Sequence, residues 1–237
     1  MPDRNRLSGN AAAFKNYVSR EFDKVVKELI DLAWAEGAPT ANFLWESDQT
    51  LDEKANTILR GLSDTLAQKA KALAEDAVRS EAEFYEDDDE WEEAKERMDM
   101  AGSHLKELLE IWIALAAVNG IGRGELRVLI SRYLNNPYAS PLWKGLPKDV
   151  LKWGRGYGKN ILEQLAVIGQ DAIINAGRRT EWMNARENGA KYYIRRRGSS
   201  YDCPDCDSLC GYPIPIDTPF EWLHSRCMCW AEYHYDE

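Results

Sequence analysis

All five cysteines of this 237-residue chain, and two of its three histidines, lie between residue 203 and the C-terminal end. Cys203 and Cys206 form a C-x2-C pair, and His224, Cys227 and Cys229 form an H-x2-C-x-C group. A C-x2-C pair places two thiolates on one tight turn at the spacing that a tetrahedral ion needs, and the second group can complete the shell from across a short loop. The sequence therefore predicts a structural zinc site in the C-terminal segment.

The expected zinc shell takes two ligands from each group, because a closed structural site has four. The second group supplies two of His224, Cys227 and Cys229. We expect Cys229 to point away from Cys227 in an extended segment, so that one of these two cysteines binds the ion and not both. Cys210 precedes Gly211 on a loop that we expect to lead away from the pair. We therefore interpret Cys210 as a packing residue and not as a ligand.

Disulfides are the covalent alternative to a metal. They would join Cys203 or Cys206 to Cys227 or Cys229 and leave one thiol over, because five is an odd number. Five buried thiols without any bond are a further alternative. The first ten residues are polar and charged, which does not resemble a secretory signal, so we expect a reducing compartment and favour metal over disulfide.

Upstream of the cysteines, apolar residues recur every three or four positions, which is typical of amphipathic helices with one buried face. Residues 1–10 are expected to form a frayed tail with Ser8 or Asn10 as N-cap, and Thr50 with Glu53 a capping box for the second helix. After the last helix, alternating segments predict short strands. The expected helices cover residues 11–35, 51–84, 91–118, 126–134 and 160–188. One strand is expected at residues 192–194, and residues 212–216 and 229–233 are expected to supply one or two more.

The predicted fold class is mainly α. Residues 1–134 would form a helical bundle or elongated helical array, and the proline- and glycine-rich residues 135–158 a hinge or loop segment. Residues 159–237 would form a small α+β lobe that zinc stabilises, because so little apolar surface cannot hold a lobe together alone. No apolar run approaches the roughly 20 residues of a membrane span, so we expect a soluble protein.

Charge is unevenly distributed along the chain, whose net charge is −10. Residues 81–99 hold eleven acidic and two basic side chains. This run predicts a solvated helix end or loop, with metal binding or docking of a basic partner as alternatives. Residues 178–197 hold seven basic and two acidic side chains. Five arginines there are candidates for binding nucleic acid or a partner: Arg178, Arg179, Arg195, Arg196 and Arg197.

A family resemblance extends over residues 165–235. It consists of Arg179-Thr180-Glu181 on a helix, Asn184-Ala185, Gly189-Ala190, an aromatic strand, C-x2-C, a glycine and proline turn, and H-x2-C-x-C. In order and spacing this segment resembles the C-terminal domain of the Mu F-like minor head proteins of tailed bacteriophages. It departs from their Pro-Pro-x-His-Pro approach to the last cysteines, where it has residues 220–225, and Cys210 is additional.

The resemblance implies a minor head protein that is present in few copies in the capsid interior near the portal, and in the host cytoplasm during assembly. Its implied role is head assembly, DNA packaging or ejection. The implied partners are the portal protein, phage DNA, and scaffold or major capsid protein.

An enzymatic function is not expected, because thiolate-rich zinc shells are closed and leave no open position for water. A different class of function is a zinc-ribbon-bearing nucleic-acid-binding regulator, in which the arginines at 195–197 would hold phosphates and Tyr192, Tyr193 and Tyr201 would stack on bases. The net charge of −10 argues against this alternative, because dedicated nucleic-acid binders are basic.

Overall fold

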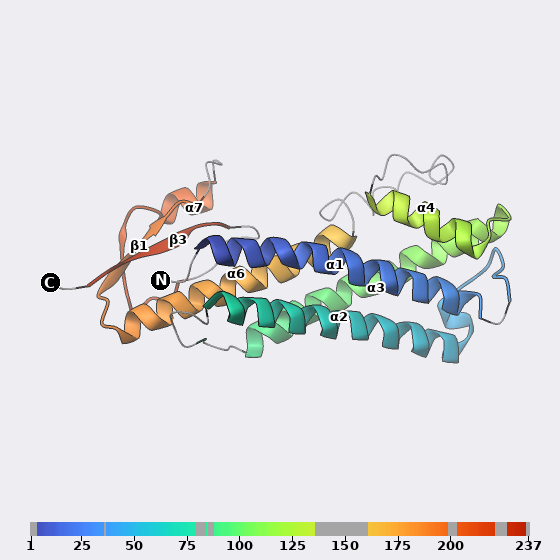
Figure 1. The fold of residues 1–237 in the computed structure, drawn as a ribbon, viewed down its shortest axis with the longest axis horizontal. Helices are drawn as coiled ribbons and strands as arrows, with labels where there is room; N and C mark the ends of the chain where they lie inside the picture. The colour runs from blue at the N-terminus through green and yellow to red at the C-terminus, as the bar shows by residue number, and fades with distance from the viewer. Residues whose placement is uncertain are drawn as a thin grey trace. The chain divides into compact units, whose positions relative to one another are not determined.

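The computed structural model describes residues 4–35, 37–78, 84, 88–135, 161–198, 203–220 and 227–235. These residues are mainly helical and end in a small antiparallel sheet, as the sequence predicted (Figure 1). The helices are α1 (Arg4–Ala33), the 3-10 turn η1 (Trp45–Ser47), α2 (Gln49–Val78), α3 (Asp88–Val118), α4 (Arg123–Asn135), α6 (Ile161–Glu187) and α7 (Pro204–Leu209). The strands are β1 (Tyr192–Arg196), β2 (Pro213–Pro215) and β3 (Trp230–His234).

Two helix starts differ from the prediction. Helix α1 begins at Arg4 instead of after a frayed tail, because Leu7 belongs to its buried face and is only 3% exposed. Helix α2 is capped by Asp48, whose carboxylate oxygen accepts hydrogen bonds from the backbone N–H groups of Thr50 and Leu51, at 2.8 and 3.1 Å. The predicted capping box at Thr50 is therefore wrong, and an aspartate two residues earlier satisfies the first amides.

The acidic run at 81–99 is described in part. Helix α3 starts at Asp88 and carries three acidic residues in its first turn, where the partial positive charge of a helix N-terminus favours them. Residues 79–83 and 85–87 lie outside the described residues, as do all but the first residue of the predicted hinge at 135–158. The hinge stays a prediction.

The chain divides into two compact units, each of which combines segments that are far apart in the sequence. Unit 1 combines residues 1–14, 68–92 and 169–237, and unit 2 combines residues 15–67 and 93–168. Long helices contribute their two ends to different units. The cysteine-bearing lobe thus shares a unit with the first turns of α1.

In unit 2, Trp45 anchors the connection between α1 and α2. Its side chain is fully buried, its indole N–H donates to the carbonyl oxygen of Lys106 at 3.1 Å, and its backbone N–H donates to Glu110 at 2.8 Å. Lys106 in turn bridges to Asp52 and donates to Asn56 on α2. These contacts join the turn η1 to helices α2 and α3 around the side chain of Trp45.

In unit 1, two glycines of α6 allow α1 to approach closely. A methyl group at Gly169 would lie 2.0 Å from the ring of Phe14, and one at Gly177 would lie 2.7 Å from Leu7. Asn10 also donates to the carbonyl oxygen of Leu73 on α2 at 2.8 Å. Small residues on one helix thus admit large side chains of another.

The sheet has the strand order β2-β1-β3 and is antiparallel throughout. Tyr193 pairs with Ile214 on one side and with Tyr233 on the other. The inner face packs on the end of α6 through a small buried cluster. Its buried members are Trp182, Ala185, Ala190, Tyr193, Ile216 and Ala231.

Helix α6 ends as the sequence predicted. Gly189 adopts a φ of +83°, a left-handed conformation that favours glycine, and the Ala190 N–H donates to the carbonyl oxygen of Ala185 at 2.9 Å. This ending turns the chain into β1 and fixes where the sheet begins.

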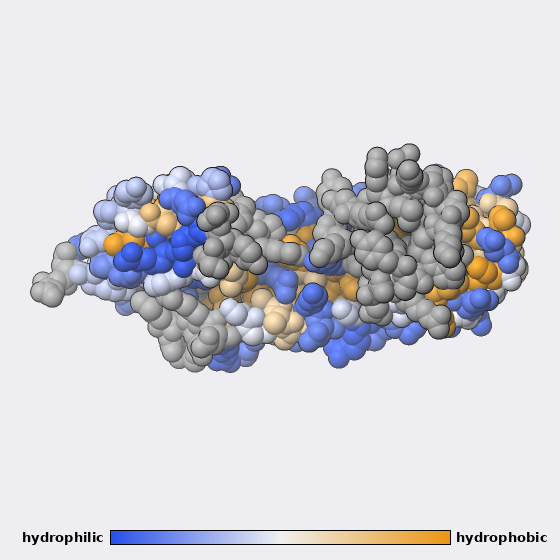
Figure 2. Space-filling model, turned by 90° about the horizontal axis from the view of Figure 1, so that it is seen from above, coloured by the Kyte–Doolittle hydropathy of each residue, from blue (hydrophilic) through white to orange (hydrophobic). Residues whose placement is uncertain are grey.

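Hydrophilic and hydrophobic side chains alternate over the face shown in Figure 2. None of the helices in the described ranges has the length and apolar character needed to traverse a bilayer.

Candidate metal centre

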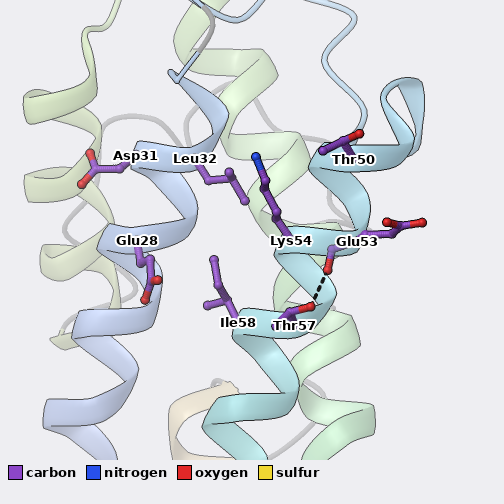
Figure 3. A pocket seen from close by; sticks show the side chains of 8 residues that line it. All are labelled: Glu28, Asp31, Leu32, Thr50, Glu53, Lys54, Thr57 and Ile58. Atoms are coloured by element: carbon purple, nitrogen blue, oxygen red, sulfur yellow. Dashed lines mark hydrogen bonds between the residues drawn. The ribbon is translucent and has the colours of Figure 1, made fainter.

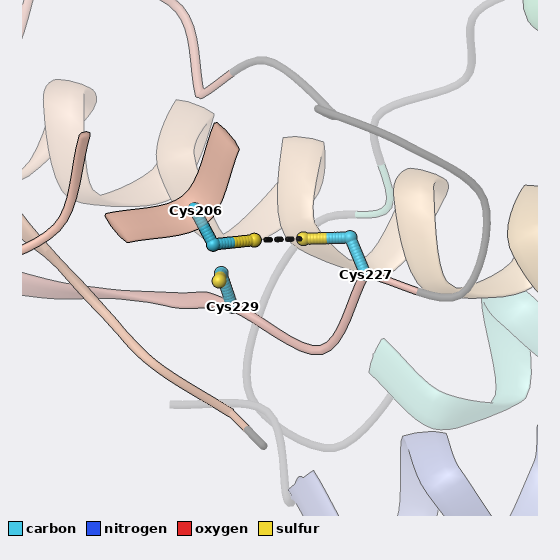
Figure 4. A group of neighbouring side chains, drawn as sticks. All are labelled: Cys206, Cys227 and Cys229. Atoms are coloured by element: carbon cyan, nitrogen blue, oxygen red, sulfur yellow. Dashed lines mark hydrogen bonds between the residues drawn. The ribbon is translucent and has the colours of Figure 1, made fainter. Parts of the chain in front are cut away.

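Three cysteine sulfurs converge in the C-terminal lobe (Figure 4). The sulfurs of Cys206, Cys227 and Cys229 all lie within 4.8 Å of one another, and those of Cys206 and Cys227 are 3.8 Å apart. All three residues are buried, with exposures of 3 to 4%. Zinc–sulfur bonds of 2.3 Å in a tetrahedron place the sulfurs about 3.8 Å from each other, so the spacing fits such an ion.

Two segments bring these sulfurs together. Cys206 lies on the short helix α7, and Cys227 and Cys229 lie on the segment that leads into β3. The chain just beyond β1 packs directly against this segment, because a methyl group on Gly198, two residues after the strand ends, would lie 1.6 Å from the carbonyl oxygen of Met228. Only glycine leaves room for this approach.

Backbone amides point at two of the sulfurs. The N–H of Gly198 donates to the sulfur of Cys229, and the N–H of Cys229 donates to the sulfur of Cys227. Hydrogen bonds of this kind stabilise a thiolate more than a thiol. At Cys229 these bonds contribute to a lowered pKa, whereas at Cys227 burial outweighs the amide and raises the pKa.

The cysteine pKa values show how the cluster shares its charge. Burial and then the hydrogen bonds to neighbouring thiols raise the pKa of Cys206, and burial beside Cys229 raises the pKa of Cys210 to about 11. Burial opposes ionisation of Cys229 as well, but hydrogen bonds from Cys206 and Cys227 and from the Gly198 amide hold its pKa below the ordinary value. Cys229 is therefore the thiol whose pKa the cluster lowers, and a bound divalent ion would also favour loss of the protons from the other thiols.

Some predicted ligands lie where expected and others do not. Cys203 packs against the cluster and its thiol hydrogen-bonds to that of Cys206. His224 lies outside the described residues. The expectation that Cys227 and Cys229 point in opposite directions is wrong, because both sulfurs turn toward Cys206. Residues two apart on an extended segment share a face, so the sequence could have predicted that Cys227 and Cys229 point to the same side.

Cys210 also differs from the expectation. It does not lead away from the cluster but ends α7, packs against the buried sulfurs, and hydrogen-bonds through its thiol to Cys229. None of the five cysteines forms a disulfide, and the sulfurs of Cys206 and Cys227 are separated by well over the roughly 2.05 Å of a disulfide bond.

Two of the five candidate arginines are buried. Arg178 is 6% exposed and lies 3.8 Å from Glu181 on the next helical turn, and Arg195 is 3% exposed with its guanidinium 4.2 Å from the ring centre of Phe220. Burial does not favour the binding role predicted for these two side chains, which stays a prediction. Their burial also means that replacing them would cost stability.

The other three candidates have different surroundings. Arg179 is exposed on α6. Arg196 donates to Glu232 at 2.6 Å, a contact that raises the pKa of Arg196 and lowers that of Glu232. Arg197 pairs with Asp207 on α7 and donates to the carbonyl oxygen of Cys203 at 3.5 Å. The basic run therefore contributes contacts within the lobe.

Sequence reasoning missed several polar contacts that fix the lobe. The indole N–H of Trp182 donates to the carbonyl oxygen of Ile216 at 2.9 Å, and the hydroxyl of Tyr193 donates to that of Pro219 at 3.1 Å. Both bonds tie aromatic core residues to the turn after β2. The alternation along β1 offered a signal for Arg195, because it shares a face with Tyr193.

Unit 2 contains an open groove of about 710 Å³ between α1 and α2 (Figure 3). Neither cysteine nor histidine lines it, and its Asp31 already pairs with Arg123 and Arg127 of α4. No catalytic grouping follows from these side chains. Its lining includes Glu28, Asp31 and Leu32 of α1 and Thr50, Lys54 and Ile58 of α2.

No family model, curated protein or solved structure matches the chain. The site is therefore interpreted from its own geometry. That geometry offers at least three thiolate ligands in a buried position, which is sufficient to hold a metal ion.

Proposed function

We propose that the C-terminal lobe binds one structural zinc ion and that the protein serves in phage head assembly without catalysing a reaction. The observation that carries the metal proposal is the convergence of the Cys206, Cys227 and Cys229 sulfurs at distances that suit a tetrahedral ion. The adjacent amide donors support it, since they favour thiolates over thiols.

Zinc would supply a cross-link where the lobe has little apolar core. The buried cluster behind the sheet has six members, three of them alanines, which gives limited hydrophobic stabilisation. A metal ion would join α7 to the segment before β3. Neither of these two parts of the lobe belongs to the sheet, so the metal would hold them together. A thiolate-rich closed shell would leave no position for catalysis.

The metal proposal is tested on the full chain purified under reducing conditions. Elemental analysis is expected to find about one zinc per chain, in keeping with one four-ligand site. Cys206→Ser is expected to remove the metal. Purified protein that holds no metal and binds no added zinc, or that joins these cysteines in disulfides, would contradict the proposal.

The role in the phage head rests on the resemblance of residues 165–235 to Mu F-like minor head proteins. The lobe has the order of elements that this resemblance implies, from the helix that carries Arg179-Thr180-Glu181, through β1, to the cysteine cluster. We propose the portal protein as the main partner, in the capsid interior, with phage DNA and scaffold or major capsid protein as further contacts.

The head role is tested by quantitative mass spectrometry of purified phage particles that carry this gene. The chain is expected in filled heads at a few copies per particle, and pull-down from infected cells should recover the portal protein with it. Particles that assemble with the chain absent from them would refute the proposal.

The alternative role as a nucleic-acid-binding regulator loses support from the site. Arg195, one of the proposed phosphate contacts, is buried, and Arg196 and Arg197 pair with Glu232 and Asp207. A salt titration of DNA binding distinguishes the roles, since a regulator would bind tightly with a steep salt dependence.

A further inference from the structure

Five thiols surround a site that needs four. Cys206, Cys227 and Cys229 form the buried centre, and Cys203 and Cys210 pack against it from the two ends of α7. A single tetrahedral zinc ion accepts four ligands. If the three central cysteines bind the ion, either Cys203 or Cys210 could supply the fourth ligand.

The two outer cysteines flank Cys206 at helical spacing, one at each end of α7. Backbone hydrogen bonds run from the Asp207 N–H to the Cys203 carbonyl at 2.8 Å and from the Cys210 N–H to the Cys206 carbonyl at 3.0 Å, so helical spacing extends over the whole segment. Positions three before and four after Cys206 lie on its own face of a helix. Each outer thiol also hydrogen-bonds to a central one, Cys203 to Cys206 and Cys210 to Cys229.

Charge near the cluster favours four thiolates. The guanidinium group of Arg197 interacts electrostatically with Cys206 and Cys229, and Arg195 and Arg197 both interact with Cys210. Zinc with four thiolates carries a net charge of about −2, whereas three thiolates and a neutral histidine leave about −1. Two neighbouring cations match the more negative shell better.

We propose that the site is a tetrathiolate whose fourth ligand is supplied by either Cys203 or Cys210, with Cys206, Cys227 and Cys229 as the constant three. This inference rests on the proposed zinc site and specifies its ligands. It makes Cys203 and Cys210 mutual substitutes, and it leaves His224 outside the shell.

The test measures zinc content and zinc affinity of the full chain in five forms. These are the wild type, Cys203→Ser, Cys210→Ser, the double variant with both changes, and His224→Ala. Each single cysteine variant and His224→Ala are expected to retain about one zinc with affinity within roughly tenfold of wild type. The double variant is expected to bind roughly a hundredfold more weakly or worse, because each of four ligands carries about a quarter of the binding free energy.

Cobalt substitution gives a second readout that does not depend on retained affinity. Sulfur-to-cobalt charge-transfer absorption grows with the number of thiolate ligands, so the wild type and both single variants should match one another, and the double variant should show a weaker band at saturating cobalt. Saturation with added metal also separates a lost ligand from a misfolded lobe, because a folded double variant regains part of the absorption.

The outcomes separate the two proposals. A wild type that binds no metal removes the zinc site itself. A metal-binding wild type whose double variant keeps full affinity, while His224→Ala loses it, overturns only the tetrathiolate. Loss of metal in Cys203→Ser alone, or in Cys210→Ser alone, overturns the interchange and assigns that cysteine as the permanent fourth ligand.

Discussion

Gly198→Ala is the sharpest single test of the geometry around the cysteines. The added methyl group would lie 1.6 Å from the carbonyl oxygen of Met228 and 2.8 Å from its Cβ. An ordinary carbon–oxygen contact is about 3.4 Å, so the backbone at Met228 must retreat by roughly 2 Å. Met228 stands between Cys227 and Cys229, and both sulfurs would move with it.

That displacement is large compared with what a metal site tolerates. Metal–ligand distances in a folded site hold to within about 0.2 Å, so a shift of roughly 2 Å removes both ligands from bonding distance. We expect zinc affinity to fall by roughly ten-thousandfold or more, since two of four ligands are lost and each carries about a quarter of the binding free energy. The lobe should then lose its protection against proteolysis, while the signal of the long helices in circular dichroism stays.

The matched control is Gly61→Ala in α2, where a methyl group meets no atom within 4 Å. Alanine is a better helix former than glycine by about 1 kcal/mol, so this variant should be slightly more stable and bind zinc as the wild type does. A competition titration with a chromophoric chelator measures the affinities. If Gly198→Ala binds zinc as tightly as Gly61→Ala, the close approach of Gly198 to the cysteine segment is refuted.

Three further outcomes are expected. Gly169→Ala should lower the free energy of unfolding by roughly 1–2 kcal/mol in a denaturant titration, because overpacking against Phe14 at 2.0 Å outweighs the gain in helix propensity; an increase would contradict the packing of α1 on α6. Arg195→Ala should cost about 2 kcal/mol or more, since a desolvated guanidinium over an aromatic ring contributes that much, whereas Arg179→Ala at an exposed position should cost less than about 0.5 kcal/mol; equal losses would count against the burial of Arg195. Chelation of the metal should leave most of the far-ultraviolet helical signal, because the long helices bury their faces against one another; collapse of that signal would show that the helices depend on the metal.

The sequence predicted α6 almost to the residue. Its apolar positions recur at helical spacing, and Gly189 supplies the left-handed turn that ends it. Alternation at residues 192–194 predicted β1, and the structure has two further strands where the sequence predicted one or two. These features could be predicted because each depends on local spacing alone.

The two compact units could not be predicted in this way. Their segments are far apart in the chain, as when Asn10 meets Leu73 and Phe14 meets Gly169. Which helices pack together depends on how well their apolar faces fit each other. The spacing of apolar residues shows that a helix has such a face, but not which helix covers it. The burial of Arg178 was missed for the same reason, since its partner Glu181 on the next helical turn could equally well pair with it in water.

The alternation along β1 explains why a metal ion would suit one end of the lobe. Tyr193 and Arg195 share the inner face of the strand, and Arg197 continues the same parity just beyond it. Tyr193 belongs to the apolar cluster, whereas Arg197 lies beside Cys206 and Cys229. One face therefore runs from apolar side chains to charged ones. Hydrophobic burial can stabilise only its first half, and in the proposed metal site thiolates around a cation would stabilise the second half.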